Sequence, residues 1–184
     1  MTQLILASQS PRRKALLLQL GIPFVIQPSR VDEYTSTSNP LTLVRELSLA
    51  KAKDIAINYS NAVVIGADTI VVHDNDILGK PTSEQEAAQM LARLSGTQHQ
   101  VYTGVCLQYV DRGGNLQEPI LFHEQTKVWF QALSAYLIQK YIASGSPMDK
   151  AGAYGIQDDW GAIFVKKIEG DYCNVVGLPL SRCY

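Results

Sequence analysis

The chain has 184 residues, 46% of them hydrophobic and 18% charged, a composition typical of one compact globular domain with an ample core. Sixteen lysines and arginines against seventeen aspartates and glutamates give a net charge of -1, which argues against a partner nucleic acid or membrane surface. No apolar segment approaches the roughly 20 residues of a membrane span and no secretory leader is recognisable, so we expect a cytoplasmic protein.

The first half of the chain alternates predicted strands and helices. A strand over 4–7 is followed by a helix over 11–20, a short strand over 24–26 and a second helix over 40–59. The nearly continuous apolar run 62–72 predicts a strand covered on both faces, at the centre of a sheet. This alternation indicates the α/β class.

The second half continues the same sheet. It predicts a short strand at 77–78, a helix between Ser83 and Gly96, strands over 101–110 and 120–130 joined by a hairpin, a helix between Ser134 and Gly145, and a strand over 163–168. We therefore expect residues 1–184 to form a single α/β domain with the 62–72 strand near the centre of its sheet. The three cysteines and three histidines show no disulfide or zinc-ligand spacing.

The turn between the first strand and the first helix gathers three cations. Ser10 is a good N-cap and Pro11 a good first helical residue, which places Arg12, Arg13 and Lys14 in the first helical turn. Because the free N–H groups there already carry positive partial charge, cations are unfavourable unless an anion binds. Together with the hydroxyls of Ser8 and Ser10, this pattern favours a phosphate-binding site. The alternative is a solvated, exposed turn.

Asp68 lies inside the most apolar stretch of the chain, where an isolated carboxylate is costly to bury. It needs a partner, which could be a metal ion, a cation such as Lys51 or Lys80, or its own proton. Each of these suits a functional cleft, whereas a structural aspartate bonded to backbone N–H groups is the plain alternative. Glu33 could join Asp68 as a ligand for Mg²⁺, although an exposed acidic pair is more often a solvated loop.

Gln157 follows a glycine-rich segment and carries a hydrogen-bond donor beside an acceptor. Uracil and thymine present the complementary pair, so this carboxamide is a candidate for reading a base edge. A surface glutamine without a ligand is the alternative.

Taken together, these segments resemble the Maf family of nucleoside triphosphate pyrophosphatases over nearly the whole chain. The resemblance rests on the following segments, in order: 6–13 (LASQSPRR), 31–33 (VDE), 51–52 (KA), 66–69 (GADT), 79–81 (GKP), 94–96 (LSG), 99–103 (HQVYT), 149–157 (DKAGAYGIQ), 170–172 (GDY) and 175–179 (VVGLP). At Thr69 and Gln157 the sequence resembles the subgroup of the family that acts on dTTP and UTP.

The resemblance implies a Maf/ITPase-like α/β fold, with a mixed, largely central sheet flanked by helices and two lobes around a deep cleft. It also implies Mg²⁺-dependent hydrolysis of the α,β-phosphoanhydride of a nucleoside triphosphate. It implies Asp68 as proton acceptor and metal ligand, with Glu33 as a second ligand. The implied specificity positions are Arg12, Thr69 and Gln157, and the implied phosphate-binding residues are Ser8, Ser10, Arg13, Lys51 and Lys80. The resemblance is also compatible with a homodimer.

Two residues depart from the family pattern, which usually has glutamate at Ser146 and glycine at Asp158. Both lie near the expected base pocket, so reaction type is more firmly indicated than base preference. Two other functions stay open at this point. One is a nucleotide-binding regulator of cell division without useful catalysis, and the other is the same reaction on a methylated purine triphosphate.

Overall fold

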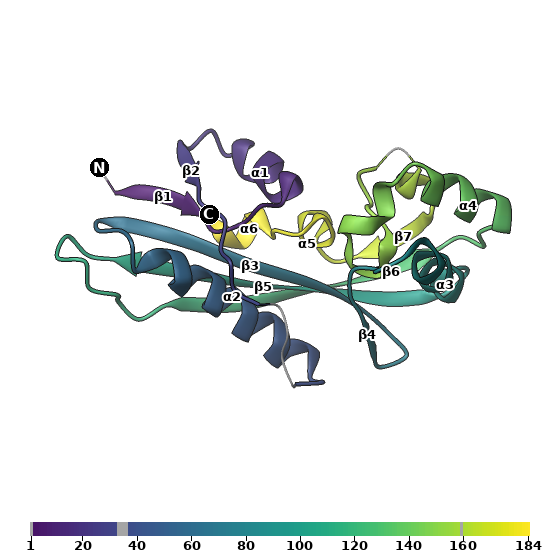
Figure 1. Cartoon of the computed structure of the whole chain (residues 1–184), viewed down its shortest axis with the longest axis horizontal. Coiled ribbons are helices and arrows are strands. Elements are labelled where there is room, and N and C mark those ends of the chain that lie inside the picture. Colours follow the sequence, from purple (N-terminus) through teal and green to yellow (C-terminus); the bar gives the residue numbers. More distant parts are fainter. Residues whose placement is uncertain (1, 33–36, 159) are drawn as a thin grey trace. The chain divides into compact units, whose positions relative to one another are not determined.

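The structure is a computed structural model that describes residues 2–32, 37–158 and 160–184 (Figure 1). The strands are β1 (Gln3–Leu6), β2 (Phe24–Ile26), β3 (Ala62–His73), β4 (Asp76–Leu78), β5 (Gln98–Val110), β6 (Ile120–Phe130) and β7 (Val165–Glu169). The α-helices are α1 (Pro11–Leu18), α2 (Pro40–Ala56), α3 (Glu84–Leu94), α4 (Ala135–Ala143), α5 (Tyr172–Val176) and α6 (Leu180–Cys183). Short 3-10 turns η1 (Ser146–Asp149), η2 (Ala151–Ala153) and η3 (Gly161–Ile163) precede β7.

The strands described form a mixed sheet in the order β2-β1-β3-β5-β6-β7, with β4 paired to β3. β1 runs parallel to both β2 and β3, whereas β4 is antiparallel to β3 and β7 is antiparallel to β6. Parallel neighbours need crossover connections, and α1 and α2 lie in those connections. The predicted α/β class and the interior position of the 62–72 strand are confirmed.

The chain divides into two compact units. The first comprises Met1–Asp68, Thr103–Glu124 and Gly177–Tyr184, and the second comprises Thr69–Tyr102 and Gln125–Val176. The predicted two-lobed organisation agrees with this division. The interpretation of residues 1–184 as one domain stays a prediction.

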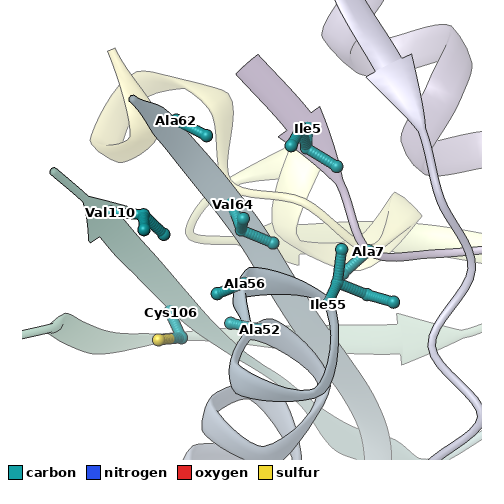
Figure 2. Close-up of a cluster of buried hydrophobic side chains, with 9 residues drawn as sticks. All are labelled: Ile5, Ala7, Ala52, Ile55, Ala56, Ala62, Val64, Cys106 and Val110. Atoms are coloured by element: carbon teal, nitrogen blue, oxygen red, sulfur yellow. The ribbon is translucent and has the colours of Figure 1, made fainter. Parts of the chain in front are cut away.

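The core of the first unit lies between α2 and strands β1, β3 and β5 (Figure 2). Its buried members are Ile5, Ala7, Ala52, Ile55, Ala56, Ala62, Val64, Cys106 and Val110. Two glycines allow α2 to approach the sheet closely. A Cβ at Gly66 of β3 would lie 2.7 Å from the backbone nitrogen of Ala52, and a Cβ at Gly104 of β5 would lie 3.0 Å from the Cβ of Val44. Any larger residue at either position would push the helix away from the sheet.

The second unit contains a cluster of buried aromatic rings. His99 packs edge-on against Phe130 and Tyr154, and its Nε2 lies 2.7 Å from the Tyr154 hydroxyl oxygen. Phe164 extends the cluster to Tyr141. Burial, with a smaller effect of the charge on His73, lowers the pKa of His99 to about 3, so this imidazole is neutral in the folded protein.

Most predicted element boundaries agree with the structure, and the differences have local causes. The strand predicted over 163–168 begins only at Val165, because Gly161–Ile163 form the 3-10 turn η3. The helix predicted to begin after Ser83 is capped by that residue, since the Ser83 hydroxyl accepts from the Glu86 backbone N–H at 3.1 Å. The Glu86 carboxylate, however, accepts from Thr82.

Among the described helices, none is long and apolar enough to cross a membrane.

Candidate active site

The predicted phosphate-binding turn is built around the N-terminus of α1. Ser10 caps the helix by accepting from the Arg13 backbone N–H at 3.4 Å, Pro11 is the first helical residue, and no acidic residue lies in the first turn. The hydroxyl oxygen of Ser8 accepts from the Ser10 backbone N–H at 3.1 Å and from Arg13 Nη1 at 3.3 Å. Ser8 is buried and Arg12 is half-buried. This turn therefore presents hydroxyl and guanidinium donors together, as the sequence predicts.

The position of the Arg13 guanidinium is fixed by a residue that the sequence analysis did not single out by itself. Arg13 Nε donates to the carbonyl oxygen of Gly177 at 2.8 Å. Gly177 has φ +127°, a conformation that residues with a side chain rarely adopt. The segment after α5 thus orients Arg13 across 164 positions of sequence. The only sequence signal for this contact is the glycine itself within 175–179.

Asp68 and Lys51 form a buried ion pair. Lys51 Nζ donates to Asp68 Oδ1 at 2.6 Å, and each side chain is only 10% exposed. Asp68 and Gly66 are two residues apart on β3 and so face the same side of the sheet, toward α2. The missing side chain at Gly66 lets α2 approach, and this approach brings Lys51 to Asp68. Of the partners that the sequence left open for Asp68, the cation Lys51 is one that the structure brings into contact with it.

The α1 turn and the Lys51–Asp68 pair lie at neighbouring strands of the first unit. β1 and β3 are parallel with Leu6 paired to Ile65, and the Ala7 backbone N–H donates to the Ile65 carbonyl at 2.8 Å. Ser8 therefore follows the carboxyl end of β1 beside the part of β3 that carries Asp68. Ligands of open α/β sheets commonly bind at the carboxyl ends of parallel strands. The arrangement places the hydroxyl and guanidinium groups of Ser8 and Arg13 beyond the end of the strand next to the one that carries the buried Asp68 carboxylate.

The donors available for a metal ion are few among the described residues. No group of three or more histidine, cysteine, aspartate or glutamate side chains gathers in residues 2–32, 37–158 and 160–184. Glu33, the second predicted ligand, lies outside the described residues. Asp68, with one oxygen held by Lys51, is the described candidate. Such a donor set fits an ion that keeps water and is bound mainly by substrate phosphates, as Mg²⁺ commonly is.

The other predicted site residues belong to the second unit. Thr69 follows Asp68 on β3, so its side chain faces the opposite side of the strand, and it is half-buried. Lys80 and Gln157 are exposed. Gln157 Nε2 donates to Asp158 Oδ1 at 2.7 Å.

Asp158 is the centre of a hydrogen-bond network that the sequence analysis missed. Its Oδ2 accepts from the hydroxyls of Ser146 at 2.7 Å and Tyr141 at 3.2 Å, and lies 3.0 Å from Lys150 Nζ. Burial acts to raise the pKa of Asp158, but the hydrogen bonds from Ser146 and Lys150 and the charge of Lys150 outweigh it and lower the pKa. Burial chiefly raises the pKa of Tyr141 to about 12, so that hydroxyl keeps its proton. The sequence signal was present, because Ser146 and Asp158 are the two departures from the family pattern.

The sequence profile of the family described as "Maf-like protein" matches residues 3–184, essentially the whole chain. The chain belongs to the Maf family. Its relatives in the family are similar to it over most of their length. A protein named dTTP/UTP pyrophosphatase from Geobacillus sp. (strain WCH70) is 54% identical over 183 residues, which cover 99% of this chain and 95% of the relative.

Two further Maf relatives carry the same name. The protein from Symbiobacterium thermophilum is 52% identical over 99% of this chain and 91% of its own length. The protein from Agathobacter rectalis is 46% identical over 100% of this chain and 95% of its own length. Among solved structures, one titled "The structure of the Staphylococcus aureus Ham1 protein" aligns with a TM-score of 0.44 and 16% identity, covering 70% of this chain and 71% of that chain. That similarity is too weak to bear on the function of this Maf protein.

Proposed function

We propose that this Maf protein hydrolyses dTTP and UTP at the α,β-phosphoanhydride, releasing the nucleoside monophosphate and pyrophosphate. The observation that carries the proposal is the buried Lys51–Asp68 pair beside the α1 turn, in a chain about half identical to proteins named dTTP/UTP pyrophosphatase. The reaction removes from the nucleotide pool these triphosphates and any modified pyrimidine analogues that fit the same site.

Asp68 accepts a proton from the attacking water in the proposed reaction. The water oxygen forms a bond to the α-phosphorus, the bond from that phosphorus to the bridging oxygen breaks, and pyrophosphate leaves with the electron pair. Lys51 holds Asp68 Oδ1, which orients Asp68 Oδ2 toward the proton and offsets the cost of burying the carboxylate. A positioned carboxylate base of this kind contributes roughly 100- to 10,000-fold to a rate.

The phosphate chain is bound by the donors of the α1 turn. Ser8, Ser10 and Arg13 supply hydroxyl and guanidinium groups, and backbone N–H groups of the turn add to them. Lys51 and Lys80 complete the proposed set of phosphate-binding residues. These cations stabilise the negative charge that develops on the leaving pyrophosphate.

A divalent ion, which we propose to be Mg²⁺, would be held by Asp68 together with Glu33. When bound, the ion neutralises charge on the phosphate oxygens. The ordinary preference of Mg²⁺ for a few carboxylates, water and phosphate oxygens supports this choice over ions that favour nitrogen or sulfur ligands.

The base is read by Arg12, Thr69 and Gln157 in this proposal. The Gln157 carboxamide offers one acceptor and one donor, which match the N3–H and a carbonyl oxygen of uracil or thymine. Cytosine has the opposite pattern at this edge, with an acceptor at N3 and a donor at its amino group.

The test is a panel of canonical and methylated nucleoside triphosphates with purified protein and Mg²⁺, analysed for pyrophosphate and monophosphate. We expect release from dTTP and UTP, and reaction in ¹⁸O-labelled water should place the label in the monophosphate, because the α-phosphorus is attacked. Label in the pyrophosphate, or no pyrophosphate from any pyrimidine triphosphate, would contradict the proposal. A preference for methylated purines would support the alternative substrate. Analytical ultracentrifugation of the same preparation tests the expectation of a homodimer.

A further inference from the structure

We propose that Asp158 is a positioning residue for base selection, because its carboxylate fixes the orientation of the Gln157 carboxamide, with the amide nitrogen toward Asp158. The inference rests on the proposed function, in which Gln157 reads the base. Asp158 is not among the site residues that the family resemblance implies. We assign to it the rejection of cytosine.

The Asp158 carboxylate is itself held firmly on one side. Its Oδ2 accepts from Ser146 Oγ at 2.7 Å and from the Tyr141 hydroxyl at 3.2 Å, and it lies 3.0 Å from the ammonium group of Lys150. The Lys150 side chain is only 8% exposed, and it also contacts Asp149 Oδ1 at 2.7 Å. The Tyr141 hydroxyl in turn accepts from the Gly155 backbone N–H at 3.1 Å. All the groups around Oδ2 are donors to it, so Oδ1 is the oxygen that remains for Gln157.

This arrangement allows only one orientation of the Gln157 carboxamide. A carboxylate accepts hydrogen bonds and cannot donate them, so the group facing Asp158 Oδ1 at 2.7 Å must be the Gln157 amide nitrogen. Rotating the carboxamide by half a turn would place two oxygens against each other. The order of donor and acceptor along the Gln157 amide edge is therefore set by Asp158.

That order decides between pyrimidines. Uracil and thymine offer a carbonyl acceptor beside the N3–H donor, whereas cytosine offers an amino donor beside the N3 acceptor. One orientation of a carboxamide matches the first pair, and the opposite orientation matches the second. A fixed Gln157 accepts uracil and thymine and leaves cytosine with two mismatched groups. Hydrogen bonds to charged groups are worth about 10- to 100-fold in an equilibrium, which is the discrimination expected from such a lock.

The experiment compares kcat/KM for UTP and CTP in the wild type and in Asp158→Asn. The asparagine oxygen should take the place of Oδ2 among the donors from Ser146, Tyr141 and Lys150, which leaves the amide nitrogen facing Gln157. Gln157 must then turn its oxygen toward position 158. We expect the UTP-to-CTP ratio of kcat/KM to fall by about 10- to 100-fold in favour of CTP.

Two further variants separate positioning from simple support of the fold. Asp158→Ala removes the constraint, so the ratio should fall without favouring CTP. Lys140→Gln is the matched control, because Lys140 neighbours Tyr141 on α4 and its ammonium group contacts the Tyr136 ring, 5.7 Å from the ring centre, rather than Asp158. In that control the ratio should stay at the wild-type value. Thermal unfolding of each variant shows whether it is folded.

The outcomes distinguish this inference from the proposed function. If the wild type releases pyrophosphate from neither nucleotide, the proposed function fails. If the wild type hydrolyses UTP and CTP equally well, or if both Asp158 variants lose activity equally on the two nucleotides with an unchanged ratio, Asp158 does not select the base. A loss that affects both nucleotides equally is what a purely structural role would produce.

Discussion

Replacing Gly66 by alanine is expected to separate Lys51 from Asp68. A Cβ at position 66 would lie 2.7 Å from the Ala52 backbone nitrogen and 2.9 Å from the Ala52 Cβ, and it would be closer still to the Ser48 carbonyl oxygen. α2 must therefore withdraw from β3 by roughly 1 Å before these contacts become ordinary. The hydrogen bond from Lys51 to Asp68 is 2.6 Å long, so the same movement stretches it beyond normal hydrogen-bond length.

The size of the effect follows from this displacement. Overpacking a close contact costs about 1–3 kcal/mol of unfolding free energy. For a chain of this length, each kcal/mol lowers the melting temperature by roughly 2–4 °C. A catalytic group misplaced by about 1 Å can cost about 100-fold in rate. Gly66→Ala should therefore melt several degrees lower and hydrolyse UTP about 100-fold more slowly.

The assay combines circular dichroism during heating with pyrophosphate release from UTP, both at fixed protein and Mg²⁺ concentration. Gly79→Ala is the control for stability, because among the described residues no heavy atom beyond the two chain neighbours lies within 4 Å of a Cβ at that position. Its melting temperature should match the wild type. A Gly66→Ala protein that melts and turns over like the wild type would refute the claim that the close approach of α2 positions Lys51.

Three other predictions concern single groups. Lys51→Met should lower the free energy of unfolding by about 3–5 kcal/mol, because it leaves the Asp68 carboxylate buried without this cation. The double variant Lys51→Met with Asp68→Leu should recover most of that loss, as measured by urea unfolding. If the double variant recovers no stability, Lys51 and Asp68 are not energetically coupled. The neutral His99, with its pKa lowered to about 3, makes the unfolding free energy decrease as pH falls below the ordinary value of 6.5, by up to about 1.4 kcal/mol per pH unit. His99→Gln should flatten this slope, and an unchanged slope would assign it to other groups. Arg13→Lys keeps the charge but cannot reproduce the contact with Gly177, so the KM for UTP should rise about tenfold. An unchanged KM would remove Arg13 from phosphate binding.

The order of strands and helices could be predicted because it depends on local signals. Apolar periodicity, the caps at Ser10 and Ser83, and the glycines that end helices all act within a few residues. The prediction that Asp68 needs a partner also followed from local composition. The choice of that partner could not be made from the sequence, because Lys51 reaches Asp68 only through the packing of α2 on Gly66.

The network around Asp158 shows the same limit. Ser146 and Asp158 are 12 positions apart, and no periodicity relates residues in turns of irregular backbone. The sequence pattern singles out Gln157 for its amide, and it marks the two neighbouring departures only as separate positions. The three-dimensional arrangement places them in one network with Lys150, and only there does the amide of Gln157 gain a defined orientation.

The central claim is that Asp68 takes the proton from the attacking water. The most direct test measures Asp68→Asn in two ways, as the Kd for a non-hydrolysable UTP analogue with Mg²⁺ and as the rate of pyrophosphate release from UTP. We predict that binding largely survives while the rate falls by about 100- to 10,000-fold. A variant that binds the analogue and turns over UTP at the wild-type rate would contradict the account.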